Sequence, residues 1–285
     1  MTVDEALARA ARRLDEAGVS SAPRDAEALL RHVLGWDTAR VVVEGGARLD
    51  PESETSFFAL VDERAARRPL QHLTGRQWFW RQELLVTPDV LVPRPETEVL
   101  VEAALEALRG VERPLVADVG TGSGCIALAI AGERPDAEVY ATDLSPAALA
   151  VARENARRLH LEHRLRFHEG DLLAPLVALS GRFALVASNP PYVGAEEVPA
   201  LPPEVREHEP SVALFPPGDR LSVYRRLAPQ AASALCPGGA LVVEVGAGMA
   251  AEVARVVGEA GLGVARIIPD LAGIPRTVVA FRPVE

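Results

Sequence analysis

A glycine-rich turn between a buried strand and an apolar helix constrains this chain more than any other feature. Residues 115–119 predict a strand, and residues 118–124 (DVGTGSG) lead directly into an apolar helical stripe at residues 126–131. The glycines permit a tight turn and let the backbone approach a ligand closely. We therefore expect a nucleotide-like cofactor above the end of this strand.

This turn belongs to a regular alternation of strands and helices that begins near residue 97. Short β-branched or apolar runs predict strands, and longer stripes at three- or four-residue spacing predict helices between them. The predicted strands are residues 115–119, 138–142, 165–168, 183–188, 240–245, 264–268 and 277–281, and the predicted helices are residues 126–131, 146–159 and 221–235. The alternation predicts the α/β class, with a Rossmann-like, mostly parallel seven-stranded sheet and helices on both faces.

The residues before this alternation predict two further parts. Apolar residues recur at helical spacing through the first seventy residues, and Asp50-Pro51 is typical of a helix start. Between residues 69 and 95, clustered aromatic and alternating apolar residues predict a short β-hairpin. We therefore expect a helical N-terminal domain at residues 1–70, a β-hairpin linker at residues 71–96 and the α/β domain at residues 97–285.

Composition excludes several classes of protein and site. The net charge of −10 disfavours a protein that gains its affinity from nucleic-acid phosphates, and no apolar run is long enough to cross a bilayer. Residues 1–16 lack the pattern of a signal peptide, so we expect a cytoplasmic protein without a membrane partner. Two cysteines, and six histidines without metal-ligand spacing, predict no disulfide framework and no metal site. No feature indicates an obligate oligomer, so a monomer is expected.

Acidic residues around the glycine turn bear on the identity of the cofactor. Asp143 follows the next strand, where a carboxylate can accept hydrogen bonds from both ribose hydroxyls. The spacing Gly122-x-Gly124-x-x-Ala127 also fits a dinucleotide fingerprint, which would place a pyrophosphate at the helix N-terminus. Asp118 instead suits a cofactor with a positively charged amino-acid tail. The motif resembles the first motif of S-adenosylmethionine (SAM) methyltransferases, with a dinucleotide enzyme or a purely structural turn as the alternatives.

A second motif, Asn189-Pro190-Pro191-Tyr192, follows the predicted strand at residues 183–188, at the same edge of the sheet. Two prolines stiffen the chain and hold carbonyl oxygens in fixed directions. The Asn189 side-chain oxygen and the Pro190 carbonyl could accept both hydrogens of a planar NH2 group, while the Tyr192 ring stacks on its face. A Pro-rich structural turn is the alternative for this motif alone, but the neighbouring glycine turn favours a site.

Such a platform suits methylation of a weakly nucleophilic nitrogen. The lone pair of an amide or aromatic amine is delocalised, and two acceptors on its hydrogens favour a pyramidal nitrogen with higher electron density. Because the methyl group of a sulfonium is already activated, in-line positioning can supply about 7 to 11 kcal/mol, and no strong base is required. The two motifs together predict methyl transfer from SAM to an NH2 group.

These motifs, with several others along the chain, resemble one family. Asn-Pro-Pro-Tyr with the glycine turn is similar to methyltransferases that act on planar NH2 groups, which include adenine-N6 DNA and protein-glutamine N5 enzymes. The segments that resemble the HemK/PrmC family, the peptide chain release factor glutamine methyltransferases, are residues 71–75 (QHLTG), 79–80 (FW), 91–98 (LVPRPETE), 209–214 (EPSVAL), 244–246 (EVG) and 270–273 (DLAG). The resemblance covers nearly the whole chain and is weakest over residues 1–65.

The resemblance implies a role for each matching residue. Gly120, Thr121, Gly122, Ser123 and Gly124 would cradle SAM, Asp143 would hold its ribose, Asp171 and Leu172 would lie beside its adenine, and Asn189, Pro190, Pro191 and Tyr192 would hold the substrate glutamine. Within this set Asn189, Pro190 and Tyr192 would be catalytic, and Asn189 would also lie beside the cofactor. Leu172 offers only apolar contact where many members have an aromatic residue. The implied substrate is the Gly-Gly-Gln loop of class I peptide chain release factors, which the helical domain would help to recognise.

Other interpretations stay open at this point. An adenine-N6 nucleic-acid methyltransferase would use the same two motifs, although the acidic charge and the lack of a basic recognition domain count against it. A SAM-binding assembly or regulatory protein would use the fold without catalysis. Arg94 and Glu96 either form a surface ion pair or shape the entry to the site, and Trp78 and Trp80 are expected to pack at the domain junction.

Overall fold

The computed structural model describes residues 1–284, within which the chain forms two compact units. One unit holds Met1–Arg76 together with Leu201–His208, and the other holds Gln77–Ala200 with the residues from Glu209 onward. The expected division at residues 70 and 96, into a recognition domain, a linker and a catalytic domain, remains a prediction. None of the helices in the described residues combines the length and the apolar character that a bilayer span requires.

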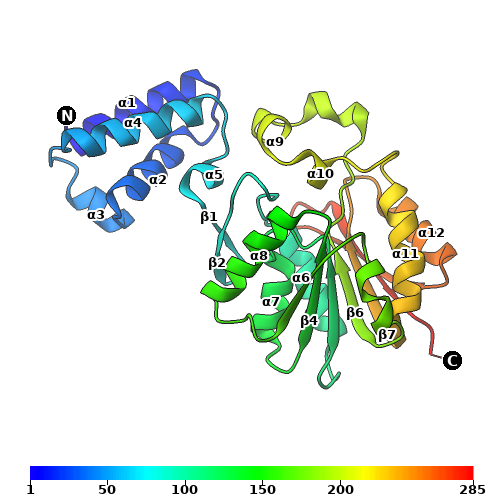
Figure 1. Cartoon of the computed structure of the whole chain (residues 1–285). Helices are drawn as coiled ribbons and strands as arrows, with labels where there is room; N and C mark the ends of the chain where they lie inside the picture. Colours follow the sequence, from blue (N-terminus) through cyan, green and yellow to red (C-terminus); the bar gives the residue numbers. More distant parts are fainter. Residues whose placement is uncertain (285) are drawn as a thin grey trace. The chain divides into compact units, whose positions relative to one another are not determined.

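The first unit is helical, as the sequence predicts (Figure 1). Its helices are α1 (Val3–Glu16), α2 (Ala22–Leu34), α3 (Thr38–Val43), α4 (Pro51–Ala65), α5 (Leu70–Thr74) and α9 (Pro203–His208). Asp50 starts α4, because its side chain accepts hydrogen bonds from Glu52 N and Ser53 N and because proline occupies the first helical position. The largest buried side chains of its apolar core are Leu14, Leu29, Leu30 and Phe57.

A network of buried charges fixes α9 within this unit. Arg64 donates hydrogen bonds to Asp25 Oδ2 at 2.7 Å and to Glu204 Oε1 at 2.9 Å, and the three side chains are 7%, 6% and 17% exposed. Arg67 donates two further hydrogen bonds to Glu204, at 2.9 and 2.7 Å. Each charge therefore has a partner, as burial requires. The sequence does not predict this grouping, since Glu204 lies 140 positions from Arg64.

A two-stranded hairpin, β1 (Arg76–Phe79) and β2 (Gln82–Leu85), is found where the sequence predicts one. Phe79 is buried, and Trp80 packs against the core of the second unit while its indole donates to Glu133 Oε1 at 2.8 Å. Trp78 is 67% exposed, so the expectation that it packs is wrong. Successive residues of a strand point to opposite faces, and the inward position belongs to Phe79.

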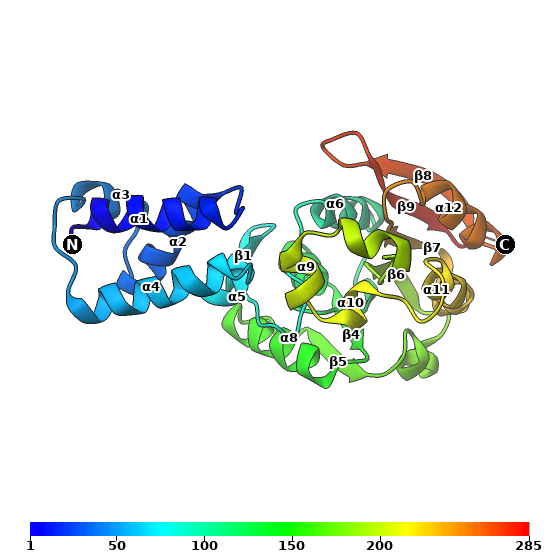
Figure 2. The ribbon, with the colours of Figure 1, turned by 90° about the horizontal axis from the view of Figure 1, so that it is seen from above.

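The second unit contains the predicted seven-stranded sheet, in the order β5-β4-β3-β6-β7-β9-β8. Its strands are β3 (Leu115–Val119), β4 (Glu138–Asp143), β5 (Leu165–Glu169), β6 (Phe183–Ser188), β7 (Leu235–Glu244), β8 (Gly263–Pro269) and β9 (Pro275–Phe281). Strands β3 to β7 pair in parallel, and β9 is antiparallel to both β7 and β8. Figure 2 shows the edge strands β5 and β8 at opposite ends of the sheet. Because β3 and β6 flank the point where strand order reverses, a ligand site is expected at their carboxyl ends.

Helices cover both faces of this sheet. They are α6 (Thr97–Ala107), α7 (Cys125–Glu133), α8 (Pro146–Arg158), α11 (Ser222–Ala234) and α12 (Ala250–Glu259), joined in part by η1 (Ala174–Leu179), η2 (Ala195–Ala200) and α10 (Ser211–Leu214). Helices α6 and α7 pack into one apolar core, and α11 and α12 into the core on the other face. Central strand β6 is buried along its whole length, which explains its continuous apolar run. Helices α6 and α12 were not predicted, and β7 begins earlier than residue 240, with a register shift opposite β6.

Candidate active site

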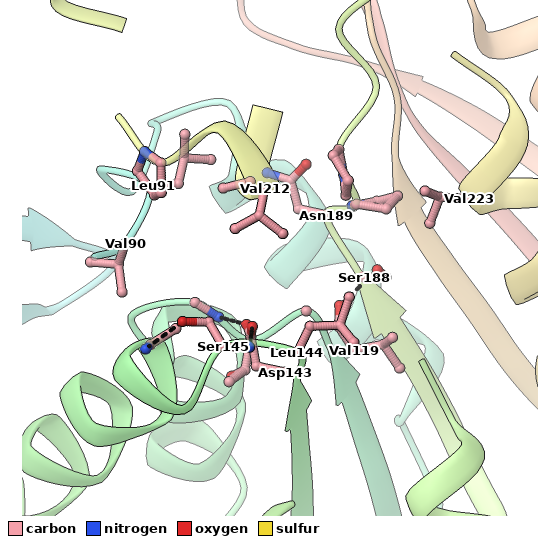
Figure 3. Close-up of a pocket in the computed structure, with 18 of the residues that line it drawn as sticks. Val90, Leu91, Val119, Asp143, Leu144, Ser145, Ser188, Asn189, Val212 and Val223 are labelled. Carbon is pink, nitrogen blue, oxygen red and sulfur yellow. Dashed lines mark hydrogen bonds between the residues drawn. The ribbon is translucent and has the colours of Figure 1, made fainter. Parts of the chain in front are cut away.

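A cavity of about 400 Å³ lies in the second unit, where β3, β4 and β6 end. The glycine turn after β3, Asp143 at the end of β4 and Asn189 after β6 all line it. Figure 3 shows Asn189 on one side of the open space and Asp143 on the other. Apolar side chains, including Val90, Val119 and Val212, form much of the remaining wall. The cavity therefore occupies the position where open α/β sheets bind ligands.

The glycine turn presents its backbone to the cavity in a fixed shape. Gly120 N and Thr121 N both donate hydrogen bonds to Thr142 O at 2.9 Å, which joins the turn to the end of β4. Gly124 caps α7 with a φ of 84°, and Gly122 has a φ of 55°, both in the left-handed region that favours glycine. The structure brings the five predicted turn residues together, and Gly120, Thr121, Gly122 and Ser123 line the cavity.

Asp118, near the end of β3, lies behind the turn with its side chain fully buried. Its Oδ2 accepts hydrogen bonds from Thr121 Oγ1 at 2.6 Å and from Ala127 N at 3.1 Å. Its Oδ1 is also buried and has no hydrogen-bond partner among the described residues. Burial raises the pKa of Asp118 to about 7. A buried acceptor without a partner, next to a ligand cavity, is suited to a cationic donor.

Asp143 lines the cavity from the end of β4. Its Oδ2 accepts a hydrogen bond from Gly122 N and its Oδ1 from Ser145 N, each at 2.9 Å. Burial raises the pKa of Asp143, while these two backbone donors act in the opposite direction. Each carboxylate oxygen retains a further lone pair, so Asp143 can still accept hydrogen bonds from two adjacent ligand hydroxyls.

Asn189, Pro190 and Pro191 line the cavity directly after β6. Asn189 Nδ2 donates to Thr97 Oγ1 at 3.3 Å, which leaves the side-chain carbonyl oxygen of Asn189 as the acceptor available to a ligand. Tyr192 is not among the residues that line the cavity. Its ring packs against the core and its hydroxyl donates to Glu244 Oε1 at 3.5 Å. A stacking role for Tyr192 therefore stays a prediction.

Asp171 and Leu172 line the cavity after β5, and their position beside an adenine stays a prediction. Thr142 Oγ1 donates to Leu172 O at 2.8 Å, and Leu172 has a positive φ of 50°, so a side-chain contact fixes an uncommon backbone conformation. Asp171 forms an ion pair with Arg226, which also lines the cavity. Leu172 therefore lies where it can make apolar contact with a ligand.

Arg94 lines the cavity, and its carboxylate partner is not Glu96, the partner in one of the two interpretations of the sequence. Its Nη2 donates to Glu209 Oε2 at 2.6 Å, and Glu209 also accepts a hydrogen bond from Val92 N at 3.2 Å. The Glu209 side chain is 1% exposed, so burial raises its pKa, and the Arg94 cation opposes this shift. A surface ion pair with Glu96 is therefore wrong, since the carboxylate that holds Arg94 is buried and 115 positions away.

Three polar residues that sequence reasoning did not assign also shape the site. Thr97 lines the cavity at the start of α6, and its hydroxyl donates to Glu244 Oε2 at 2.6 Å. Asn155 of α8 donates to Ser123 O at 2.9 Å and exchanges two hydrogen bonds with the backbone of Leu85, so it ties the glycine turn to β2. Thr97 and Glu244 fall within the segments that resemble the family, which was the available signal. No signal in the sequence indicated Asn155, which is a polar residue within a predicted helix.

The acceptors around the cavity fit a nucleoside with a cationic tail better than a dinucleotide. Asp118 lies behind the turn and does not itself line the cavity, but its carboxylate disfavours a pyrophosphate there and suits a protonated amino group. Asp143 can accept from a ribose, and Leu172 offers an apolar wall. Within residues 1–284, no group of three or more His, Cys, Asp and Glu side chains is placed to hold a metal ion. The acceptors and the apolar wall of the cavity fit SAM.

Comparison with known proteins gives the same assignment. The PrmC N-terminal domain matches residues 5–75, and the methyltransferase small domain matches residues 95–201. The release factor glutamine methyltransferases of Cereibacter sphaeroides and Deinococcus radiodurans are each 46% identical to this chain, over 99% of both sequences in each case. Among solved structures, a methyltransferase from Pyrococcus furiosus shares the fold, with a TM-score of 0.53 and 19% identity over 80% of this chain and 98% of the other. The chain belongs to the release factor glutamine methyltransferase family.

Proposed function

We propose that this protein transfers a methyl group from SAM to the side-chain amide nitrogen (N5) of the glutamine in the Gly-Gly-Gln loop of class I peptide chain release factors, and so modulates translation termination. The proposal rests on one observation, that residues predicted to bind the cofactor and residues predicted to bind the substrate line opposite sides of one cavity. The glycine turn and Asp143 line one side, and Asn189, whose NH2 group is held by Thr97, lines the other. Release factor glutamine methyltransferases at 46% identity over nearly the whole chain support the same reaction.

We assign cofactor binding to residues whose side-chain acceptors or backbone groups already lie where they could bind the cofactor. When bound, SAM supplies an electrophilic methyl group on a positively charged sulfur. Asp118 accepts from the amino group of the tail, Asp143 holds the ribose, and Asp171 and Leu172 lie beside the adenine. The turn residues Gly120, Thr121, Gly122, Ser123 and Gly124 form the cradle.

The substrate side is assigned to Asn189, Pro190 and Pro191, which line the cavity, and to Tyr192, which follows them in the chain. The side-chain oxygen of Asn189 and the carbonyl oxygen of Pro190 accept the two hydrogens of the glutamine amide, and Pro191 stiffens the segment. Tyr192 limits the position of the amide plane. Two acceptors hold the nitrogen lone pair toward the methyl group and favour its pyramidal form. After transfer, one N–H proton leaves the methylated nitrogen for solvent, and no strong base is required.

The proposal extends to partners and setting. The release factor is the macromolecular substrate, with the N-terminal helical domain contributing to its recognition, and the enzyme acts as a monomer in the cytoplasm. No nucleic acid is required, in keeping with the net charge of −10. The names of the relatives favour release factors over the alternative substrate, adenine in a nucleic acid.

A labelling experiment tests this proposal directly. The purified protein is incubated with methyl-labelled SAM and a class I release factor, in parallel with the same factor whose loop glutamine is replaced by alanine, and with duplex DNA. We expect label on the intact factor alone, at the loop glutamine by mass spectrometry. Label on the alanine variant would move the modification to another residue, and label on DNA alone would replace the proposed substrate by a nucleic acid.

A further inference from the structure

A chain of hydrogen-bonded side chains lies behind Asn189 in the second unit. Asn189 Nδ2 donates to Thr97 Oγ1 at 3.3 Å, and the Thr97 hydroxyl donates to Glu244 Oε2 at 2.6 Å. Tyr192 OH donates to the other oxygen, Glu244 Oε1, at 3.5 Å. Thr97 and Glu244 are each only 2% exposed, so water does not compete for these contacts. The chain joins the start of α6, the end of β7 and both ends of the Asn-Pro-Pro-Tyr motif.

The direction of these hydrogen bonds determines which atom of Asn189 faces the ligand. An ionised carboxylate can only accept, so Glu244 requires the Thr97 hydroxyl to point its hydrogen toward it. The Thr97 oxygen is then left with lone pairs, and it can be satisfied only by a donor, which is the NH2 group of Asn189. With its NH2 group held by Thr97, the Asn189 side chain must turn its carbonyl oxygen away from Thr97. The polarity of one buried carboxylate thus sets the orientation of an amide two hydrogen bonds away.

The orientation matters because the two faces of the Asn189 amide have opposite chemistry. Its carbonyl oxygen attracts an N–H of the substrate amide, whereas its NH2 group would repel that N–H and could bind only the substrate oxygen. A reversed Asn189 would therefore bind the glutamine in the wrong orientation, with its nitrogen displaced from the methyl group. A displacement of about 1 Å can reduce a rate by about 100-fold.

We propose that Thr97 and Glu244 are positioning residues for methyl transfer, which fix the Asn189 side chain with its carbonyl oxygen toward the substrate glutamine. This inference rests on the proposed function and adds to it two residues outside the Asn-Pro-Pro-Tyr motif. Thr97 lines the cavity, whereas Glu244 is not among the residues that line it. Both act through Asn189, and Glu244 acts through Thr97 as well.

The charges around Glu244 determine how this series of hydrogen bonds responds to pH. Burial, and to a smaller extent the Glu96 carboxylate, raise the pKa of Glu244. The hydrogen bonds from Thr97 and Tyr192 and the Arg276 cation lower it, and the net result is a pKa of about 7. The thiol of Cys125 and the hydroxyls of Tyr192 and Tyr224 are the other titratable groups coupled to it, and the pKa of each is raised, so all three remain neutral near pH 7. Protonated Glu244 no longer requires Thr97 to donate to it. The rate of methyl transfer should therefore rise with pH as Glu244 ionises.

The first test compares two variants of Thr97 with the native protein, using a release factor and saturating SAM. Thr97→Val keeps the shape of the side chain and removes its hydroxyl, while Thr97→Ser is the matched control that keeps the hydroxyl. We expect Thr97→Val to lower kcat by about 10- to 100-fold, with Kd for S-adenosylhomocysteine within about twofold of the native value, and Thr97→Ser to recover most of the rate. Equal kcat values for the two variants would overturn the proposal.

A pH profile gives a second measurement that does not depend on Thr97→Val folding. The native kcat, measured between pH 5.5 and 8.5, should rise with an inflection near 7, and Glu244→Gln should remove that inflection. An inflection of the same size in Glu244→Gln would assign it to another group and contradict the role of Glu244. If the native protein labels no release factor, the proposed function fails and this inference fails with it. A labelled factor with a Thr97→Val rate equal to that of Thr97→Ser removes the inference alone.

Discussion

The two sides of the cavity are built in different ways. On the cofactor side, backbone groups make most of the contacts, as where Gly120 N and Thr121 N bind Thr142 O, and the carboxylate of Asp143 reaches Gly122 N across only 21 positions. On the substrate side, Asn189 is held by a side chain 92 positions away, and that side chain by another 147 positions away. The cofactor side depends on the backbone conformation of the glycine turn, whereas the substrate side depends on individual side-chain hydrogen bonds.

The difference predicts how each side responds to substitution. A turn held by several backbone hydrogen bonds keeps its shape when one side chain changes, so affinity for the cofactor should decline in steps. A chain of side-chain hydrogen bonds fails as a unit when one member is lost, so the rate should fall sharply while cofactor affinity stays the same. Four predictions test this contrast, ordered by the size of the expected effect.

Asn189→Ala should have the largest effect. It removes the acceptor for one hydrogen of the substrate amide, and kcat should fall by about 100- to 1,000-fold, as for other preorganised groups that stabilise a transition state. Binding of S-adenosylhomocysteine, measured by calorimetry, should stay within about twofold of the native value. A comparable loss of cofactor affinity would mean that the two sides are not separable.

Asp143→Ala should produce the opposite pattern. It removes the carboxylate that holds Gly122 N and Ser145 N and that would accept from the ribose, so Kd for S-adenosylhomocysteine should rise by about 10- to 100-fold. At saturating SAM, kcat should remain close to native. Asp143→Asn keeps one acceptor oxygen and serves as the control, with an intermediate Kd. A fall in kcat larger than the rise in Kd would contradict the division between the two sides.

Asp118→Asn should change how stability depends on pH. Because burial raises the pKa of Asp118 from 3.8 to about 7, the folded protein keeps a proton that the unfolded chain releases in this interval. The free energy of unfolding therefore falls as pH rises through the interval, by about 1 kcal/mol per pH unit from this residue. Asparagine removes this contribution, so the variant should become more stable relative to the native protein between pH 5 and pH 7.

Urea unfolding at pH 5, 6 and 7 measures this change. Glu244 titrates in the same range but is present in both proteins, so its contribution cancels in the difference. A difference in free energy of unfolding that stays constant across the three pH values would show that Asp118 is not the group that retains the proton.

The difference in stability between Gly124→Ala and Gly122→Ala should be the smallest of the four effects. Both glycines have positive φ, so alanine costs each of them about 1 kcal/mol. A Cβ at Gly124 would also lie 3.1 Å from Leu128 Cδ1, whereas a Cβ at Gly122 would meet no atom within 4 Å. Thermal unfolding should therefore show Gly124→Ala to be less stable by about a further 1 kcal/mol. Equal stability would mean that the start of α7 shifts to make room.

The same contrast explains what the sequence could predict. The sequence could place the glycine turn, Asp143, Asn189, Pro190 and Pro191 near one another, because each follows a recognisable strand and strand ends meet at one edge of a parallel sheet. The partners of these residues were not identified, since a hydrogen bond between Thr97 and Glu244 leaves no periodic or local pattern. Arg94 illustrates the same limit, because Glu96 is near in sequence while Glu209 is near in space.

The grouping of Leu201–His208 with the N-terminal helices has a consequence for attempts to take the protein apart. A fragment that ends at residue 76 would lack Glu204 and leave the guanidinium of Arg64 with Asp25 as its one carboxylate partner among the described residues. A fragment that begins at residue 77 would keep the segment around Glu204 without the helices that receive it. The same cut removes both hydrogen bonds from Arg67 to Glu204, so the contacts that hold α9 in the first unit are lost together. A single cut therefore damages both fragments, and the contribution of the helical unit has to be measured by substitution in the intact chain.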